Sequence, residues 1–174
     1  MPPSNHNVDF LLVQMTESLR KLIQDKNLEN PLFIGIRTGG IWIADKLHKN
    51  LAIEAPMGTL DISFYRDDFT RVGLDPKVQP SNLPSSTQDR HIILIDDVVK
   101  TGRTIRAALN ELFDYGRPAS VSLVALLDLG CRELPISADI VGSCINLNSE
   151  QQIKLIGPEP LALEISQRQG SELT

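Results

Sequence analysis

The sequence contains few cysteines and few aromatic residues. Its 174 residues include two cysteines, Cys131 and Cys144, and aromatic side chains make up 5% of the total. Two cysteines provide neither a disulfide framework nor the ligand spacing of a zinc site, so we expect a protein of the reducing cytoplasm. Because aromatic side chains are scarce, Val, Ile and Leu must fill most of the core.

Long apolar runs and an excess of basic side chains are also missing. No stretch reaches the ~18 apolar residues of a membrane-spanning helix, and the first residues have no basic start or apolar segment of a secretory signal. With 17 basic and 22 acidic side chains the net charge is −5, so nucleic acid would bind only to a local basic patch. The length favours a single domain over residues 1–174.

Apolar patterns along the chain alternate between those of strands and those of helices. They predict helices at 8–26, 41–50 and 105–113, and strands at 32–36, 57–65, 91–95, 121–127, 140–141 and 153–156. This alternation predicts an α/β fold with a central, mainly parallel sheet flanked by helices. Residues 66–90 have little periodicity and three prolines; we interpret them as a flexible lid over a functional site, with a surface insertion as the alternative.

The most informative segment joins a buried strand to an acid pair and a glycine-containing turn. Asp96 and Asp97 follow the strand, and residues 101–104 (Thr-Gly-Arg-Thr) then open a helix. Ligands of open α/β sheets bind at the carboxyl ends of strands, and amides at a helix N-terminus attract anions. A ligand with vicinal hydroxyls and a phosphate would satisfy both halves. A simple strand cap and turn is the alternative, and the Walker and dinucleotide-binding glycine patterns are absent from this segment.

This segment resembles the 5-phosphoribosyl-1-pyrophosphate (PRPP) motif of the type I phosphoribosyltransferases. Three further segments narrow the resemblance: residues 35–40, residues 58–68, and residues 116–118 together with 132–136. Together they are similar to the PyrR family of bifunctional pyrimidine operon regulators and uracil phosphoribosyltransferases. The resemblance runs from about residue 8 to residue 157, and its motifs follow the order of the family.

The resemblance implies a fold, a reaction and a set of site residues. The fold would carry a small hood at residues 128–165 and a flexible lid at 66–90, and the reaction would convert uracil and PRPP to UMP and pyrophosphate. The catalytic residues would be Asp96, Asp97 and Arg66. PRPP or UMP would be bound by Thr38, Gly39, Gly40, Asp96, Asp97, Val98, Val99, Lys100, Thr101, Gly102, Arg103 and Thr104. Uracil would lie in the hood against Asp128, Leu129, Gly130 and Cys131. The cofactor would be Mg²⁺, held by Asp96 and Asp97 indirectly, through water or ribose hydroxyls.

Some positions depart from the family pattern. Many members carry Arg at position 39 and have an Arg and a His where this chain has Leu129 and Cys131. We expect an Arg restored at position 39 to raise turnover if its absence limits the handling of pyrophosphate. Cys131 is interpreted as a small apolar filler rather than a nucleophile. Purine-specific relatives usually have Asp at position 100; the charged Lys100 cannot act as a base, which argues against a purine enzyme.

The resemblance implies a second role in transcription attenuation, through nucleotide-dependent binding of the pyrimidine operon mRNA leader. It also suggests a homo-oligomer, either a dimer or a tetramer, and no membrane partner. The basic side chains that could form an RNA-binding face, or could be scattered solvated charges, are Arg20, Lys21, Lys26, Arg103, Arg106, Arg117 and Lys154. Two alternatives remain open: a UMP- or UTP-sensing RNA-binding regulator with weak or lost catalysis, and a phosphoribosyltransferase for another base.

Overall fold

The computed structural model describes residues 7–62 and 81–168 of the chain. In chain order, the elements are α1 (Val8–Asp25), β1 (Leu32–Ile36), α2 (Gly39–Asn50), β2 (Gly58–Leu60), β3 (His91–Val99), α4 (Arg103–Asp114), β4 (Ser120–Asp128), β5 (Ile140–Cys144), β6 (Gln151–Ile156) and β7 (Ala162–Gln167). Most of the predicted lid therefore lies outside the described residues.

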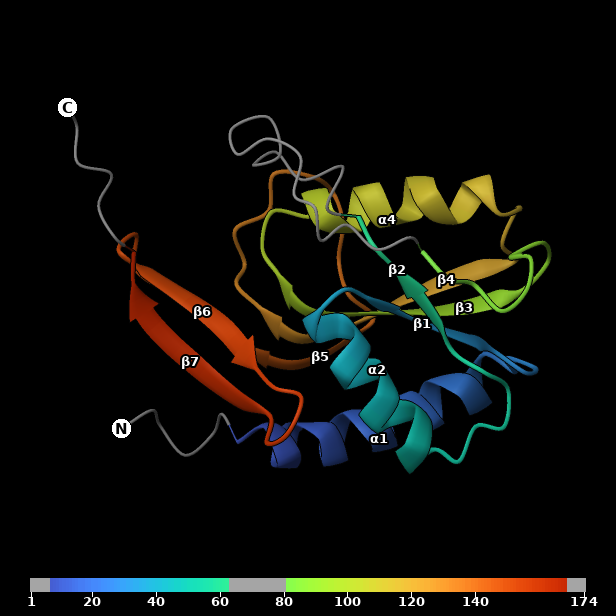
Figure 1. Ribbon diagram of the computed structural model, residues 1–174, viewed down its shortest axis with the longest axis horizontal. Helices are drawn as coiled ribbons and strands as arrows, with labels where there is room; N and C mark the ends of the chain where they lie inside the picture. The colour runs from blue at the N-terminus through green and yellow to red at the C-terminus, as the bar shows by residue number, and fades with distance from the viewer. Residues whose placement is uncertain (1–6, 63–80, 169–174) are drawn as a thin grey trace.

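A five-stranded parallel sheet forms the centre of the molecule. Its strand order is β2-β1-β3-β4-β5. Helices α1 and α2 lie on one face and α4 lies on the other (Figure 1). This confirms the predicted α/β architecture. The chain runs outward from β1 to β2 on one side and resumes at β3 on the other, so the switch in direction falls between β1 and β3, where open α/β sheets bind their ligands.

Successive residues of β1 and β3 contribute to two separate cores. Phe33, Ile93 and Ile95 pack with α1 and α2 on one face. Ile34 and Leu94 pack with α4 on the other face. Because side chains alternate between the faces of a strand, a strand covered on both faces needs apolar residues at every position. This requirement accounts for the unbroken apolar runs in the sequence.

The largest differences from the predicted strand lengths are in β3 and β2. β3 continues past residue 95 to Val99, so the acid pair lies inside the strand rather than after it. The reason is the neighbouring strand: Asp96 pairs with Ala125, and Val98 with Leu127, so the ladder with β4 persists beyond the apolar run. β2 is three residues long and shorter than the predicted 57–65, of which 63–65 lie outside the described residues.

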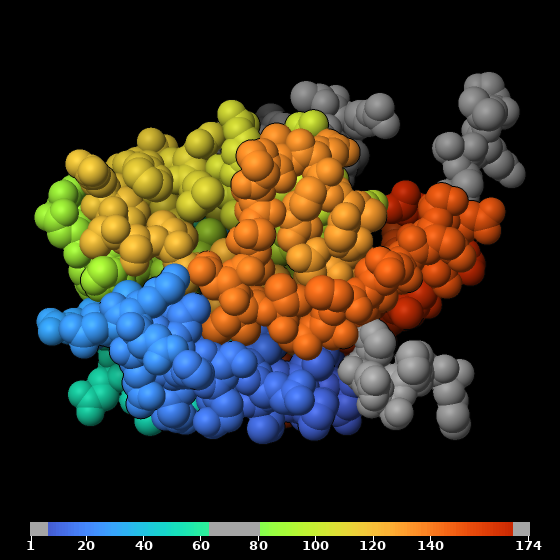
Figure 2. Space-filling view, turned by 180° about the vertical axis from the view of Figure 1, so that it is seen from behind, coloured from blue at the N-terminus to red at the C-terminus, as the bar shows by residue number. Residues whose placement is uncertain are grey.

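An antiparallel hairpin of β6 and β7 lies beside the main sheet (Figure 1). The sequence predicted a strand at 153–156 but not β7. Leu155 is buried in the core that α1 and α2 cover, and Leu163 packs against this core. The turn of the hairpin lies on α2, because a Cβ added to Gly157 would come within 2.8 Å of the Trp42 ring. Seen from behind, the hairpin extends past the orange segment that follows β4 (Figure 2).

The described residues include no helix with the length and apolar character needed to cross a bilayer.

Candidate active site

Close backbone packing sets the turn between β1 and α2 against β3. A Cβ on Gly40 would lie 2.6 Å from the carbonyl oxygen of Ile95, and one on Gly35 would lie 2.7 Å from the Cα of Ile41. Only glycine allows these approaches without a shift of the backbone. The start of α2 therefore rests directly on the sheet, and the turn at residues 38–40 lies beside the carboxyl half of β3.

Gly39 lies against the side chain of Asp97. A Cβ on Gly39 would overlap the carboxylate oxygen Oδ2 and come within 2.6 Å of its Cγ. Any side chain at position 39 must therefore displace Asp97. An Arg at position 39 would therefore require the Asp97 carboxylate to move, and the expectation that it raises turnover stays a prediction.

The two carboxylates of β3 lie in different surroundings. Asp96 is 3% exposed and lines a small pocket together with the turn that opens α4. Asp97 is directed toward the turn after β1. Each carboxylate also accepts a hydrogen bond from the next amide, Asp97 N to Asp96 at 2.9 Å and Val98 N to Asp97 at 3.0 Å. One strand therefore places an acid toward each of the two loops that were predicted to bind PRPP.

The predicted phosphate loop is shaped by Gly102. This residue is the N-cap of α4 and has φ of +92°, a left-handed conformation that L side chains rarely adopt. The Arg103 amide donates to the Thr101 hydroxyl at 3.2 Å. The adjoining pocket has a volume of about 60 Å³ and is lined by Asp96, Val98, Val99, Lys100, Thr101, Gly102, Thr104 and Ile105. The structure thus brings most of the predicted phosphate-loop residues together around one cavity.

The hood is fastened to the phosphate loop by several hydrogen bonds. The amides of Glu133 and Leu134 donate to the carbonyl of Thr101 at 3.0 and 3.2 Å. The Arg103 side chain, predicted to bind the ligand, donates instead to the Glu133 carboxylate at 2.7 Å, so its guanidinium is directed to the hood. A loop held in this way keeps its shape before a ligand arrives.

Arg132 provides the most extensive of these links. Its guanidinium donates to the carbonyls of Lys100 at 2.9 Å and Ile136 at 2.6 Å, and to both carboxylate oxygens of Asp128. Burial raises the pKa of Asp128, but the hydrogen bonds from Arg132 and the Gly130 amide, together with the charge of Arg132, outweigh it and hold the pKa below its ordinary value. The carboxylate of Asp128, predicted to face uracil, is therefore occupied in shaping the hood.

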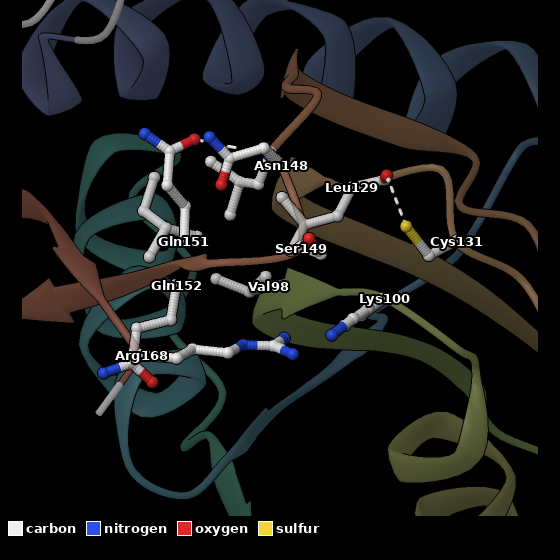
Figure 3. Close-up of a pocket in the computed structure, with 11 residues that line it drawn as sticks. Val98, Lys100, Leu129, Cys131, Asn148, Ser149, Gln151, Gln152 and Arg168 are labelled. Carbon is white, nitrogen blue, oxygen red and sulfur yellow. Dashed lines mark hydrogen bonds between the residues drawn. The ribbon is translucent and has the colours of Figure 1, made fainter. Parts of the chain in front are cut away.

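A larger pocket opens between the end of β3, the hood and the hairpin (Figure 3). Its volume is about 250 Å³, and its lining residues are Val98, Lys100, Leu129, Cys131, Leu147, Asn148, Ser149, Gln151, Gln152, Ile153 and Arg168. The predicted hood residues Leu129 and Cys131 are among them, and the Cys131 thiol donates to the Leu129 carbonyl at 3.3 Å. Gly130 is in a turn with φ of +67°. Both cysteines are free.

Sequence reasoning missed most of the wall of this pocket. Asn148, Gln151, Gln152 and Arg168 line it from the segment around the hairpin, and the guanidinium of Arg168 extends into it (Figure 3). These residues lie far along the chain from β3, and no local pattern signals that the hairpin folds back over the sheet. Arg66, predicted to be catalytic, lies outside the described residues.

Asp96 and Asp97 have the donor type that Mg²⁺ requires. Among the residues that the structure describes, no group of three or more His, Cys, Asp or Glu forms a protein cage for a metal. Mg²⁺ is usually held by one or two carboxylates together with water and substrate oxygens rather than by a full protein cage. Two carboxylates next to a phosphate-sized cavity fit this mode of binding.

Comparison with known proteins assigns the fold to a class. A family model described as "Phosphoribosyl transferase domain" matches residues 11–161, so the chain belongs to the phosphoribosyl transferase family. Among curated proteins, the Bifunctional protein PyrR of Pseudomonas paraeruginosa is 58% identical over 154 residues, which cover 88% of this chain and 91% of that protein. The Bifunctional protein PyrR of Nitrosococcus oceani is 52% identical over 165 residues, which cover 94% and 93%. Within its family, the chain belongs with the PyrR proteins.

Solved structures confirm the fold. The hypoxanthine phosphoribosyltransferase of Trypanosoma cruzi superimposes with a TM-score of 0.62 at 22% identity, over 83% of this chain and 82% of that one. A hypoxanthine-guanine phosphoribosyltransferase from Bacillus anthracis gives 0.63 at 17% identity, over 80% and 79%. At these identities the likeness concerns the fold alone.

Proposed function

We propose that this protein transfers a phosphoribosyl group from PRPP to uracil, forming UMP and pyrophosphate. The observation that carries this proposal is a pair of adjoining pockets that share Val98 and Lys100. The smaller one adjoins Asp96 and the phosphate loop, and the larger one has room for a pyrimidine ring. The turn at residues 38–40 lies on the opposite side of β3, in contact with Asp97. Phosphate, base and leaving group would thus have separate places around one strand end.

The residues act mainly by holding the reactants in line. The amide-rich start of α4 binds the 5′-phosphate, since amides at a helix N-terminus favour anions. Asp96 accepts hydrogen bonds from ribose hydroxyls, and the turn at 38–40 holds the pyrophosphate. As the bond from C1′ to pyrophosphate breaks, positive charge develops on the sugar, and the carboxylates of β3 stabilise it. Holding base and sugar in one orientation accounts for much of the remaining rate.

Mg²⁺ would be held near Asp96 and Asp97 through water or ribose hydroxyls. When bound, it supplies positive charge that offsets the charge gathering on pyrophosphate.

The relatives are named Bifunctional protein PyrR, which supports a second role. We propose that this role is the regulation of pyrimidine genes through an mRNA leader. Four of the basic side chains predicted for an RNA-binding face pair with acids in the structure: Arg20 with Glu17, Lys21 with Asp25, Lys26 with Asp139, and Arg103 with Glu133. Exposed pairs of this kind are weak, typically below about 1 kcal/mol, so phosphates could replace the acids. We include in this proposal a cytoplasmic homo-oligomer that responds to UMP or UTP.

A uracil-dependent assay with PRPP and Mg²⁺ tests the catalytic role. UMP should form, and the variant Asp96→Asn/Asp97→Asn should lose it while keeping its fold by circular dichroism. An Asp114→Asn variant, which removes an exposed acid at the end of α4, should retain activity. Absence of UMP with the wild-type protein, while UMP still binds by calorimetry, would favour the regulator without catalysis.

A further inference from the structure

The larger pocket holds two cations and no acid. Lys100 and Arg168 are among its eleven lining residues, and none of the eleven is Asp or Glu. Their side chains extend into the pocket from opposite sides (Figure 3). In the chain as a whole acids outnumber bases, 22 to 17, so this lining departs from the surrounding charge.

Neither cation is compensated within the described part of the chain. No ion pair joins Lys100 or Arg168 to an acid there, whereas Arg103 and Arg132 beside them are paired with Glu133 and Asp128. Both residues are exposed, so water and salt screen the repulsion between them, and a negative charge placed between them would be attracted to both.

The rest of the lining suits a flat heterocycle. Val98 and Leu129 give an apolar surface. Asn148, Gln151 and Gln152 line the edge of the pocket. Asn148 Oδ1 and Gln151 Oε1 accept from the amides of Glu150 and Asn148, and Gln152 Nε2 donates to Ser166, so the other amide atom of each side chain is left for a ligand. A ligand that fills this pocket while its sugar lies in the neighbouring one would have ring faces that are apolar, edges that are polar, and a negative charge. Neutral uracil has the first two properties but not the third.

We propose that the pocket binds uracil as the anion formed by loss of its N1 proton, with Lys100 and Arg168 stabilising the negative charge. This inference rests on the proposed function and names the ionic form of its substrate. The proton leaves N1 to solvent, the N1 electron pair forms the bond to C1′ of PRPP, and the bond from C1′ to pyrophosphate breaks, with pyrophosphate taking its electrons. A lysine at position 100 then assists the reaction without acting as a base.

The groups that titrate around the bound base are few. Lys100, Cys131 and Arg168 face it, and the nearest hood acid, Asp128, is held by Arg132. Glu150, next to the lining residues, is exposed, and its carbonyl accepts from the Arg168 amide. An ionisation of the base can be told from that of the thiol with 5-fluorouracil, whose ring proton is more acidic because fluorine withdraws electrons.

The first measurement is the pH dependence of UMP formation in a single turnover, with saturating uracil and PRPP. At a given pH below the plateau, Lys100→Met and Arg168→Gln should each lower the rate about tenfold, and should move the rising limb up by about one pH unit. With 5-fluorouracil the rising limb of the pH-rate profile should move to lower pH in the wild type and in every variant. Lys49→Met, which removes an exposed cation from α2, should have the same rate and the same pH profile as the wild type.

The second measurement needs no turnover. An ultraviolet difference titration reports the ionisation of bound uracil directly, and the anion should form at a lower pH in the wild-type complex than in free uracil or in the Lys100→Met complex. If bound uracil ionises at the same pH as free uracil, the inference is wrong even when UMP forms. If bound uracil ionises at a lower pH than free uracil but no UMP appears, the proposed catalysis fails and the inference stands. If Lys100→Met and Arg168→Gln change only the KM for PRPP, the cations bind pyrophosphate rather than the base, and the inference is wrong.

Discussion

Arg132 binds both carboxylate oxygens of Asp128, Nη1 to Oδ1 at 2.9 Å and Nη2 to Oδ2 at 2.6 Å. Nη1 also donates to the Lys100 carbonyl at 2.9 Å. The end of β4, the hood and the phosphate loop are thus joined by one guanidinium. Lys100 lines both pockets, so its backbone position affects the shape of both.

Replacing Arg132 with Met should loosen this junction. The side chains of Arg132 and Asp128 are 21% and 17% exposed, so the pair lies between a surface and a buried ion pair, and its loss should lower the free energy of unfolding by about 2 kcal/mol. PRPP binding should weaken as well, because the loop loses one of its ties. Urea denaturation and calorimetry measure the two effects. Arg20→Met, which breaks an exposed pair, should cost less than about 1 kcal/mol; equal losses would mean that Arg132 has no special role.

Low pH should weaken the same pair of Arg132 and Asp128. The pKa of Asp128 is lowered in the folded protein from 3.8, so its ionised form stabilises the fold above that value, and this contribution is lost as the pH falls below 3.8 toward the folded pKa. The free energy of unfolding should therefore drop more steeply in the wild type than in Asp128→Asn over that interval. Parallel curves for the two proteins would show that Asp128 does not contribute to the acid dependence.

Gly39→Ala should impair the acid pair without a general loss of stability. The added Cβ must displace the Asp97 carboxylate, so UMP formation should fall at least tenfold. A double-mutant cycle of PRPP binding checks the cause: Gly39→Ala should cost less in an Asp97→Ala background than in the wild type, because the contacts with Oδ2 and Cγ are gone and only the Cβ at position 97, 2.9 Å away, remains. Additive losses would indicate that Gly39 acts through something other than Asp97.

Gly102→Val should block ligand binding at the phosphate loop. Its φ of +92° disfavours a β-branched residue, and the new Cβ would lie 3.4 Å from the Cβ of Ile136. We expect UMP binding to fall at least tenfold by calorimetry. Gly102→Ala is the matched control, since it has the same positive φ but adds no branched side chain; equal losses in both variants would point to backbone strain rather than to a blocked phosphate site.

Much of the fold could be predicted because its signals are local. The apolar runs of β1 and β3 follow from burial on both faces, and the acid pair and the turn at Gly102 lie within one continuous segment. The contact of Gly39 with Asp97 could not be predicted, because it joins two segments through the packing of α2 on the sheet. β7 escaped prediction because its exposed outer face carries a weak apolar pattern.

The residues that line the larger pocket could not be predicted from the sequence for a related reason. Asn148 and Arg168 reach it only after the hairpin has folded back beside the sheet, and neither has a neighbour in sequence that signals a site. Arg132 was included in a family motif, but its role depends on the carbonyl of Lys100, which no sequence pattern reveals.

The hairpin of β6 and β7 has one more consequence. It lies apart from the parallel sheet, yet its flanking residues furnish one side of the pocket and the sheet furnishes the other. Under the proposed function, the loop that opens α4 would hold the sugar phosphate, and the hairpin segment would line one side of the base. Substitutions in that segment would then alter base preference while leaving the phosphate loop unchanged.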